Sequence, residues 1–129
     1  MATNKKFEDL DIWQLARTIS RNINQLTQKG LFKKDFSLVD QMKRSSGSAM
    51  DNIAEGFERD NNKEFSYFLN VAKGSTGECR SQLYRALDCG YITTEEFEQN
   101  YNECMSLSKQ IRGFSDYLKN TEIKGHKFK

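Results

Sequence analysis

The sequence of 129 residues contains no proline, and this absence constrains its fold more than any other single feature. Proline lacks a backbone N–H, and its ring clashes with the preceding turn of a helix. Average proteins contain about 5% proline, so the deviation is large. No segment is therefore barred from forming a long, uninterrupted helix, and the composition favours an all-α protein. The length is that of one domain with a single hydrophobic core.

Four segments carry apolar residues at steps of three and four positions, which is the pattern of an amphipathic helix. We predict helices at residues 10–28, from about 37 to 58, at 63–88 and at 94–119. Thr93 and Glu96 form a capping box for the fourth helix, and Ser37 and Asp40 form a weaker variant for the second. Gly90 is the predicted stop of the third helix.

Short connections between the helices make neighbours antiparallel, so the predicted fold is an up-down-up-down four-helix bundle. One of these connections, residues 29–35, is predicted to be a polar loop. The bundle is expected to span residues 10–119, after an N-terminal arm at residues 1–9. Residues 120–129 contain little apolar material and carry Lys124, Lys127 and Lys129, which predicts a mobile basic tail.

Several classes of protein are excluded by what the sequence lacks. Its longest apolar runs are a few residues, far below the ~20 of a membrane span, and residues 1–6 form no hydrophobic signal segment. We therefore expect a cytoplasmic protein without a membrane partner. Cys79, Cys89 and Cys104 are odd in number and lack CxxC spacing, which disfavours a disulfide framework or a zinc site. We expect them to be reduced, small apolar residues.

No cofactor or metal is predicted, and the chain is not expected to be an enzyme. Di-iron bundles need Glu-x-x-His pairs on facing helices, whereas the single histidine, His126, lies in the predicted tail. No phosphate-binding or dinucleotide-binding glycine motif is present in the sequence. Asp51, Glu55 and Glu58 share one side of the second helix. A solvated acidic face, or ion pairs with Arg59, explains them better than acid–base catalysis.

Small side chains form a stripe along the second helix, at steps of four, three and four residues: Ser45, Ala49, Asn52 and Gly56. Such a stripe lets another backbone approach closely. The third helix offers a matching set of small residues, namely Ala72, Ser75, Thr76 and Cys79. That helix also contains Gly74 and Gly77, each of which costs about 1 kcal/mol relative to alanine inside a helix. The sequence leaves open whether the close contact forms within one subunit or between two.

Exposed cations are predicted to lie in pairs on the helix faces, where they could contact phosphates without reading base sequence. The candidate nucleic-acid-binding residues are Arg17 and Arg21 on the first helix, Lys43 and Arg44 on the second, and Lys73 and Arg80 on the third. The formal net charge is only +2 and the pI is about 8.4, below the value of about 9 that marks a dedicated nucleic-acid-binding domain. Binding would therefore depend on local pairs that are repeated around an oligomer.

The block Asn52-Ile-Ala-Glu-Gly56 and the residues that follow it resemble the signature of a bacterial protein family. The shared positions continue through Arg59, Phe65, Phe68, Leu69, Ala72, Gly74, Ser75, Glu78 and Leu83, and the opening Phe7-Glu-Asp-Leu10 with Trp13 and Ala16 also fits. The family is that of the 23S rRNA intervening-sequence proteins, and the resemblance covers residues 7–118. The accessory variability protein of diversity-generating retroelements is similar to this family.

The resemblance implies a four-helix bundle that assembles into a homopentameric, barrel-like ring without known catalytic activity. Some genes of the family lie within insertions in the large ribosomal RNA gene, and the accessory variability protein binds nucleic acid and its reverse transcriptase through basic surfaces. The matching motif residues are expected to be structural: Asn52, Ile53, Ala54, Glu55, Gly56, Arg59 and Glu78. The polar ones among them would hold helix ends by hydrogen bonds and ion pairs.

Two functions follow as hypotheses. The first is a non-enzymatic homo-oligomer, expected to be a pentamer, that binds RNA or other nucleic acid such as DNA through repeated basic patches. The second is a scaffold that docks a protein partner through a helical face. An enzyme that uses Asp51, Glu55 or Glu78 is the weakest alternative, because the chain has no nucleophile, cofactor motif or ligand set.

Overall fold

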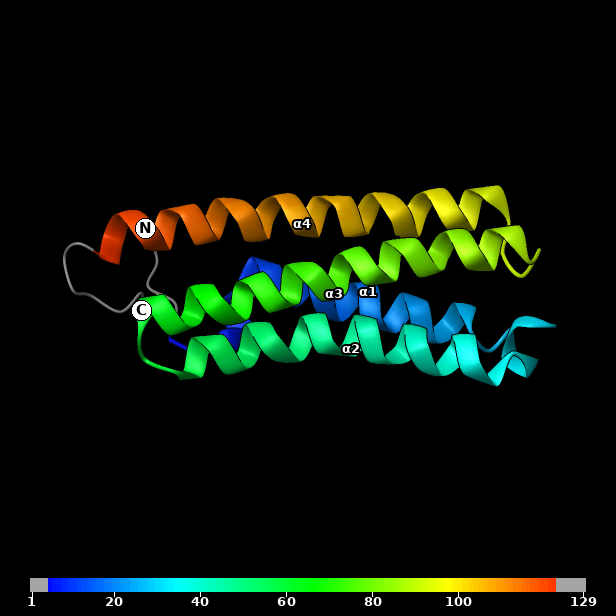
Figure 1. Ribbon diagram of the computed structural model, residues 1–129, viewed down its shortest axis with the longest axis horizontal. Coiled ribbons are helices and arrows are strands. Elements are labelled where there is room, and N and C mark those ends of the chain that lie inside the picture. The colour runs from blue at the N-terminus through cyan, green and yellow to red at the C-terminus, as the bar shows by residue number, and fades with distance from the viewer. Residues whose placement is uncertain (1–4, 123–129) are drawn as a thin grey trace.

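The computed structural model describes residues 5–122, which form four long helices and two single turns of 3-10 helix. The helices are α1 (Asp11–Leu26), α2 (Phe36–Glu58), α3 (Asn62–Asp88) and α4 (Thr94–Glu122). The 3-10 turns are η1 (Phe7–Asp9), before α1, and η2 (Phe32–Lys34), between α1 and α2. Figure 1 shows the four helices side by side along one long axis. The predicted all-α class is confirmed.

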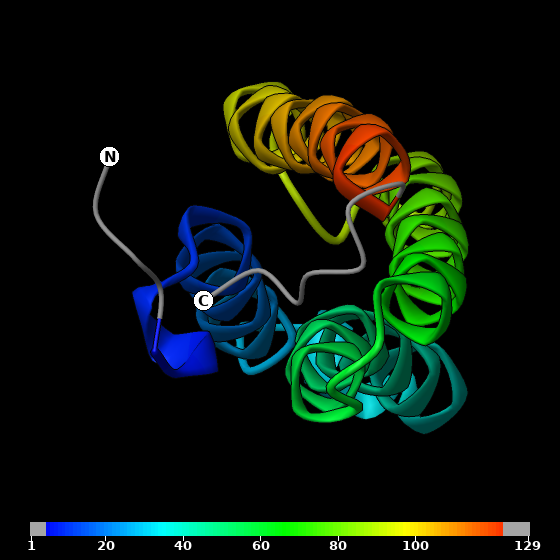
Figure 2. The same ribbon diagram turned by 90° about the vertical axis from the view of Figure 1, so that its left-hand side faces the viewer.

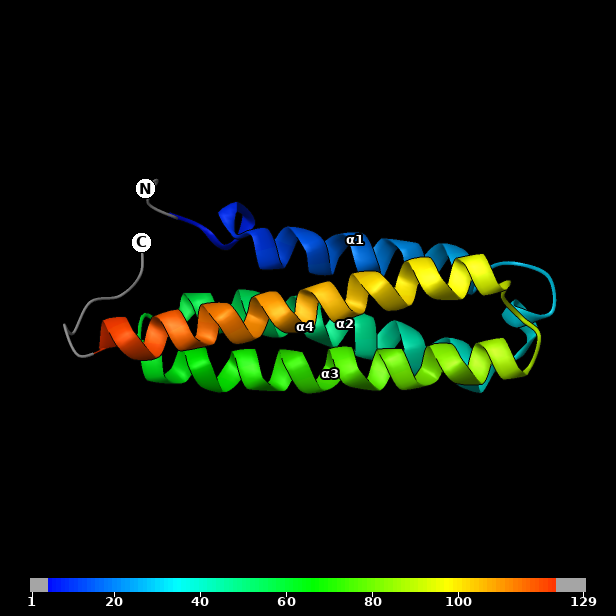
Figure 3. The same cartoon turned by 90° about the horizontal axis from the view of Figure 1, so that it is seen from above.

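The helices form a bundle in which neighbours in the sequence are also neighbours in space. α1 contacts α2, α2 contacts α3 and α3 contacts α4. The contact between α1 and α4, which completes the bundle, is less extensive than these three. The end view shows this order around the bundle axis (Figure 2). The view from above shows that the α1–α2 and α3–α4 connections lie at one end of the bundle (Figure 3). Short connections thus produce the antiparallel arrangement that they predict.

A continuous apolar core runs through the middle of the bundle, as the three- and four-residue spacing predicts. α1 buries one stripe against its neighbours: Ile12, Ala16, Ile19, Ile23 and Leu26. The other helices add side chains that are almost completely buried, among them Met42, Ile53, Leu69, Leu83, Leu107 and Ile111. Each large side chain of this kind contributes roughly 1.5–3 kcal/mol by leaving water. The contact between apolar faces, rather than helix propensity, is what stabilises the helices.

The start of α4 confirms the predicted capping box. The Glu96 N–H donates to Thr93 Oγ1 at 3.0 Å, and the Thr93 N–H donates to Glu96 Oε1 at 2.9 Å. Lys29 Nζ lies 2.8 Å from Glu96 Oε2, and this contact, together with the Thr93 N–H, holds the pKa of Glu96 below its usual range. Gly90, at the end of α3, has a φ of +74°, which lies in the left-handed region that glycine enters without steric cost.

The connection between α1 and α2 differs from the predicted polar loop. Phe32 is fully buried there, and its ring stacks on that of Tyr91 from the α3–α4 connection, with the two centroids 5.1 Å apart. The pattern could not show this burial, because the connection of residues 27–35 carries no helical periodicity. Phe32 therefore extends the core to the end of the bundle, where the two connections meet.

The N-terminal cap of α2 is also different from the prediction. The predicted pair of Ser37 and Asp40 is wrong, because Asp35 caps the helix and α2 begins at Phe36. Asp35 Oδ1 accepts the Leu38 N–H at 3.1 Å. Aspartate is a strong cap because its side-chain oxygen satisfies one of the free N–H groups of the first turn.

The predicted arm and tail are described only in part. Phe7 of the arm lies in η1, and its ring meets that of Trp13 edge-on with the centroids 5.1 Å apart, so this part of the arm packs on the bundle. α4 continues to Glu122, beyond its predicted end at residue 119. Residues 1–4 and 123–129 lie outside the described residues, and with them the three lysines of the predicted tail.

The stripe of small residues on α2 faces α3, so the close contact forms within the subunit. The stripe is buried at Ser45, Ala49 and Gly56, and α3 buries Ala72, Thr76 and Cys79. A Cβ atom at Gly56 would lie only 2.8 Å from Phe68 Cβ. Ser45 Oγ donates to Gln82 Oε1 across the two helices at 2.6 Å. We call this contact the α2/α3 seam.

The helical glycines outside the seam have no such neighbours. A Cβ atom added at Gly74 or Gly77 of α3 would meet nothing within 4 Å, and the same holds for Gly47 of α2 and Gly113 of α4. The α2/α3 seam therefore does not offset the cost of Gly74 and Gly77. Each glycine still costs about 1 kcal/mol in the middle of a helix. No packing contact within the described part of the chain requires them.

Candidate nucleic-acid interface

Arg17 and Arg21 form the best-defined basic site. They lie one turn apart on α1, both exposed, and line a shallow groove of about 310 Å³ together with Glu8, Trp13, Gln14 and Thr18. The Arg17 guanidinium carbon lies 5.8 Å from the centroid of the Trp13 ring, within the range of a cation–π contact. Within residues 5–122, neither arginine forms a salt bridge. Both positive charges are therefore available to an anion.

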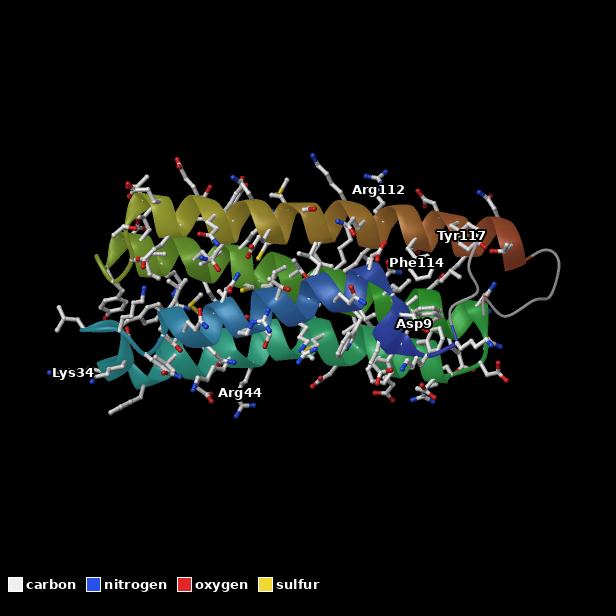
Figure 4. All side chains as sticks on the ribbon, turned by 180° about the vertical axis from the view of Figure 1, so that it is seen from behind. Asp9, Lys34, Arg44, Arg112, Phe114 and Tyr117 are labelled. Carbon is white, nitrogen blue, oxygen red and sulfur yellow. The ribbon has the colours of Figure 1, made fainter. Side chains whose placement is uncertain are left out.

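Lys43 and Arg44 form a weaker candidate site for an anion than their adjacency in the sequence suggests. Arg44 Nε lies 2.8 Å from Asp40 Oδ2, one helical turn away, so a carboxylate already balances its charge. The Arg44 side chain extends away from the bundle (Figure 4). Lys43 is exposed and forms no salt bridge in the described residues. The spacing of four residues between Asp40 and Arg44 is the signal that could have revealed this ion pair.

Lys73 and Arg80 lie seven residues apart, which places them on the same side of α3. Lys73 is exposed, whereas Arg80 is half-buried. The Arg80 guanidinium carbon lies 5.7 Å from the centroid of the Tyr101 ring on α4, so this arginine spans the two helices. Arg80 keeps its charge in this contact, because an aromatic ring attracts a cation without neutralising it.

The three basic pairs do not converge on one face of the subunit. α1 and α3, which carry the arginine pair and the Lys73–Arg80 pair, occupy opposite corners of the bundle (Figure 2). α2 lies between them and carries Lys43 and Arg44. One subunit therefore presents several small basic sites rather than one broad positive surface.

The motif residues of α2 do contribute to the structure. Asn52 Nδ2 donates to the Ser48 carbonyl at 2.8 Å, and Ile53 and Gly56 are buried. Arg59 Nη2 lies 2.7 Å from Glu55 Oε2, and the Arg59 guanidinium carbon lies 4.9 Å from the Phe68 ring centroid on α3. Arg59 therefore joins the end of α2 to the start of α3.

Two other motif residues have smaller roles. Ala54 is half-buried against the core. Glu78 is exposed and forms no hydrogen bond or salt bridge with any other described residue, so the structure gives no support to its predicted role at a helix end. Glu55, Asp51 and Glu58 are also exposed. The ion pair between Glu55 and Arg59 agrees with the predicted structural role of these acidic residues, which was the alternative to acid–base catalysis.

The described residues contain no group of three or more histidine, cysteine, aspartate or glutamate side chains that could hold a metal ion. Cys79 and Cys104 are buried, whereas Cys89 is exposed at the end of α3, and none of the three forms a disulfide with another described residue. A contact with Cys79, and then burial, raises the pKa of the Cys104 thiol. A protonated thiol is a poor nucleophile. Along residues 5–122, no helix is both long and apolar enough to cross a bilayer.

Residues 8–113 match the sequence model of the 23S rRNA-intervening sequence protein family. The chain belongs to this family. The structure is similar to the crystal structure of a protein of unknown function from the S23 ribosomal protein family of Bacteroides thetaiotaomicron, with a TM-score of 0.73. The two are 21% identical, and the match covers 81% of this chain and 97% of that one. At this identity, the likeness supports the fold alone. No curated protein matches the sequence.

Part of the groove around Arg17 and Arg21 was not predicted from the sequence. Trp13, Gln14 and Thr18 line the groove beside Arg17 and Arg21, whereas only the two arginines were predicted as binding residues. The signal was present, because these five residues follow one another at alternating steps of one and three residues and so share one side of α1. Gln14 Nε2 also donates to the Glu8 carbonyl at 2.8 Å, which ties η1 to the groove.

Proposed function

We propose that this member of the 23S rRNA-intervening sequence protein family is a non-enzymatic homo-oligomer that binds RNA or other nucleic acid through repeated basic patches. The observation that carries the proposal is the groove of Arg17 and Arg21, where two exposed guanidinium groups lie one turn apart without a carboxylate partner in the described residues. Guanidinium groups suit phosphate oxygens because they donate several hydrogen bonds in one plane. Lys73 and Lys43 add further cations on the other helices.

Self-assembly is supported by the glycines that have no neighbour within the subunit. Gly47, Gly74 and Gly77 lie on the two neighbouring helices α2 and α3, and each leaves open space where a Cβ atom would be. A helix from a second copy could approach the backbone closely at these positions. Such a contact would offset the cost of about 1 kcal/mol per glycine. The family resemblance favours a closed ring of five subunits.

Assembly matters for binding because a single subunit offers only small basic sites. A ring repeats each site around its axis, and several weak contacts to one long polyanion then act together without any new contact. The net charge of +2 per chain is multiplied in the same way. Nucleic-acid affinity is therefore expected to depend on assembly.

A gel-shift titration with a structured RNA at several salt concentrations tests the proposal. The double substitution Arg17→Gln and Arg21→Gln should weaken binding and should reduce the slope of log affinity against log salt by about 0.9 per lost contact on a duplex. The matched control is Arg17→Lys with Arg21→Lys, which keeps both charges and should retain most of the slope. An unchanged slope in the glutamine variant would remove this groove from the interface.

A scaffold that docks a protein partner is the second candidate function, and one feature favours it. Between α1 and α4 lies a second groove of about 310 Å³, lined by Leu10, Ile12 and Phe114 among others. Phe114 is seen on α4 near the start of α1 in Figure 4. A protein that forms a ring, binds no RNA or DNA at low salt and captures one defined protein partner through this groove would favour the scaffold.

A further inference from the structure

The connection between α1 and α2 exposes two large apolar side chains that the fold does not use. Leu31 is 68% exposed and Phe36 is 80% exposed, the highest values among the large hydrophobic residues of the described chain. They lie within six consecutive residues, on either side of the buried Phe32. A single exposed apolar residue needs no explanation, but apolar residues gathered with charged ones often mark a binding site.

This connection is held in place from both sides, so its exposed residues point outward from a fixed support. The Phe32 ring stacks on the Tyr91 ring at 5.1 Å, and the Tyr91 hydroxyl donates to Asp35 Oδ2 at 2.9 Å. Asp35 Oδ1 accepts the Leu38 N–H at 3.1 Å. Preorganisation of this kind lowers the entropy that binding must overcome.

Two lysines stand beside the exposed apolar side chains. Lys33 and Lys34 are exposed, and neither forms a salt bridge with a described residue. Lys34 extends outward at the end of the bundle in Figure 4. The Asp35 carboxylate accepts hydrogen bonds from the Leu38 N–H and the Tyr91 hydroxyl, and it forms no salt bridge with either lysine. We call Leu31, Lys33, Lys34 and Phe36 the loop tip.

We propose that the loop tip binds unpaired nucleotides of a single-stranded nucleic acid, with a base stacked on the Phe36 ring and neighbouring phosphates on Lys33 and Lys34. The inference rests on the proposed function and names the form of nucleic acid that this end of the bundle selects. Stacking on an aromatic ring requires a base that is free of its pair, whereas the arginine groove of α1 accepts phosphates from paired and unpaired strands alike.

The chemistry of the loop tip favours a nucleic acid over a lipid surface. An interfacial membrane anchor needs a broad apolar face, and its affinity scales with the apolar area that it buries. The loop tip offers two apolar side chains, separated by the inward-facing Phe32 and flanked by lysines. One exposed ring and adjacent cations are instead the elements of a single-strand stacking site.

The substitution Phe36→Trp gives a direct readout of stacking. The native tryptophan, Trp13, is buried but lines the arginine groove, so the signal of an indole at position 36 is the difference between the Phe36→Trp variant and the unmodified protein in the same titration. Addition of an oligouridine of about 12 nucleotides, within the usual site size, should quench this emission. Vesicles that contain an anionic lipid should leave the emission unchanged. A blue shift with vesicles and no quenching by the oligouridine would overturn the proposal and indicate a membrane contact.

Affinity measurements on the full-length protein separate the loop tip from the arginine groove. Phe36→Ala should weaken oligouridine binding by about 5- to 100-fold and leave binding to a duplex RNA nearly unchanged. Replacing Lys33 and Lys34 by glutamine should reduce the single-strand salt slope by about 1.4. The controls lie at the opposite end of the bundle: Tyr67→Ala, a change at another exposed aromatic residue, and the double change of Lys63 and Lys119 to glutamine.

The failure of this inference is distinguishable from the failure of the proposed function. If Phe36→Ala binds oligouridine as tightly as the unmodified protein while the Arg17→Gln and Arg21→Gln variant loses affinity, the loop tip is not the site and nucleic-acid binding stands. If the unmodified protein binds neither oligouridine nor duplex RNA at low salt, both proposals fall. Equal losses for Phe36→Ala and Tyr67→Ala would also overturn the inference, because the effect would not be specific to the loop tip.

Discussion

The α2/α3 pair has an inner side and an outer side, and small residues occur on both. On the inner side, each small residue of the α2/α3 seam meets a neighbour, as at Gly56, where a Cβ atom would lie 2.8 Å from Phe68 Cβ. On the outer side, Gly47, Gly74 and Gly77 leave space that nothing in the described chain fills. The inner set is explained by the fold of one subunit. No contact within the described residues accounts for the outer set, and we propose that a second copy approaches there.

The largest expected effect lies on the inner side, at Gly56. Gly56→Leu should lower the free energy of unfolding by about 3 kcal/mol, because Phe68 and Phe65 already occupy the space that the new side chain needs. A thermal or denaturant melt measures this. Asp51→Leu introduces the same side chain at an exposed position of α2 and should stay within about 0.5 kcal/mol of the unmodified protein. Equal melting temperatures for both variants would mean that the seam is not closely packed.

A second effect on the inner side is expected at Ser45. Ser45→Ala removes the donor to Gln82 Oε1 and leaves a buried oxygen without that partner, which should cost about 2 kcal/mol. Ser48→Ala is the matched control, because Ser48 shares a 2.9 Å hydrogen bond with Ser75 where both side chains are half-buried and water can replace it. A larger loss at Ser48 than at Ser45 would contradict the assignment of the seam as the buried contact.

The two faces that meet on the inner side could be predicted from the sequence because their signals are local, whereas their meeting within one subunit could not. The step of three and four residues in the stripe gives a helical face, and Ala72, Thr76 and Cys79 on α3 follow the same rule. The capping box at Thr93 and Glu96 likewise fixed the start of α4, since it needs only two residues three positions apart. Phe32 was missed because its burial depends on Tyr91, which is distant in the sequence. The Asp35 cap was missed although its signal is local, because its side chain accepts the Leu38 N–H only three residues later.

The outer side was harder to predict, because an exposed residue carries no periodic constraint. The helical period places Gly74 and Gly77 on the side of α3 opposite Ala72 and Thr76, but the sequence could not show that nothing in the subunit packs against them. The candidate basic site was found in part: Arg17 and Arg21 were named, whereas the pairing of Arg44 with Asp40 was not. The exposed Phe36 was missed because its neighbourhood was classified as a polar loop.

A substitution on the outer side should have opposite effects on the subunit and on the oligomer. Gly77→Ala adds a methyl group to open space, so helix propensity alone should stabilise the isolated subunit by about 1 kcal/mol. The proposed contact with a second copy predicts that the same change weakens assembly, which light scattering at several protein concentrations would detect as a loss of mass. A stabilised protein with an unchanged oligomer would show that this outer position is free surface.

The smallest effect is expected at the exposed motif residue Glu55. Glu55→Gln breaks the 2.7 Å ion pair with Arg59, but both side chains are about half exposed, so the loss should be about 0.5 kcal/mol or less. A denaturant melt at low and moderate salt checks this value, because screening should reduce it further. A loss above about 2 kcal/mol, or the loss of a hydrolytic activity, would indicate a role for Glu55 that the described contacts do not contain.

The salt dependence of RNA binding by the assembled protein tests the central claim most directly. It should be measured beside a variant, such as Gly77→Ala, whose subunits remain folded but dissociate. We predict a closed oligomer near five times the 15.0 kDa subunit mass, whose RNA affinity falls steeply with added salt, and much weaker binding by the dissociated variant with the same charges. A stable monomer that binds RNA as tightly as any oligomer, or an oligomer that binds neither RNA nor DNA at low salt, would contradict the account.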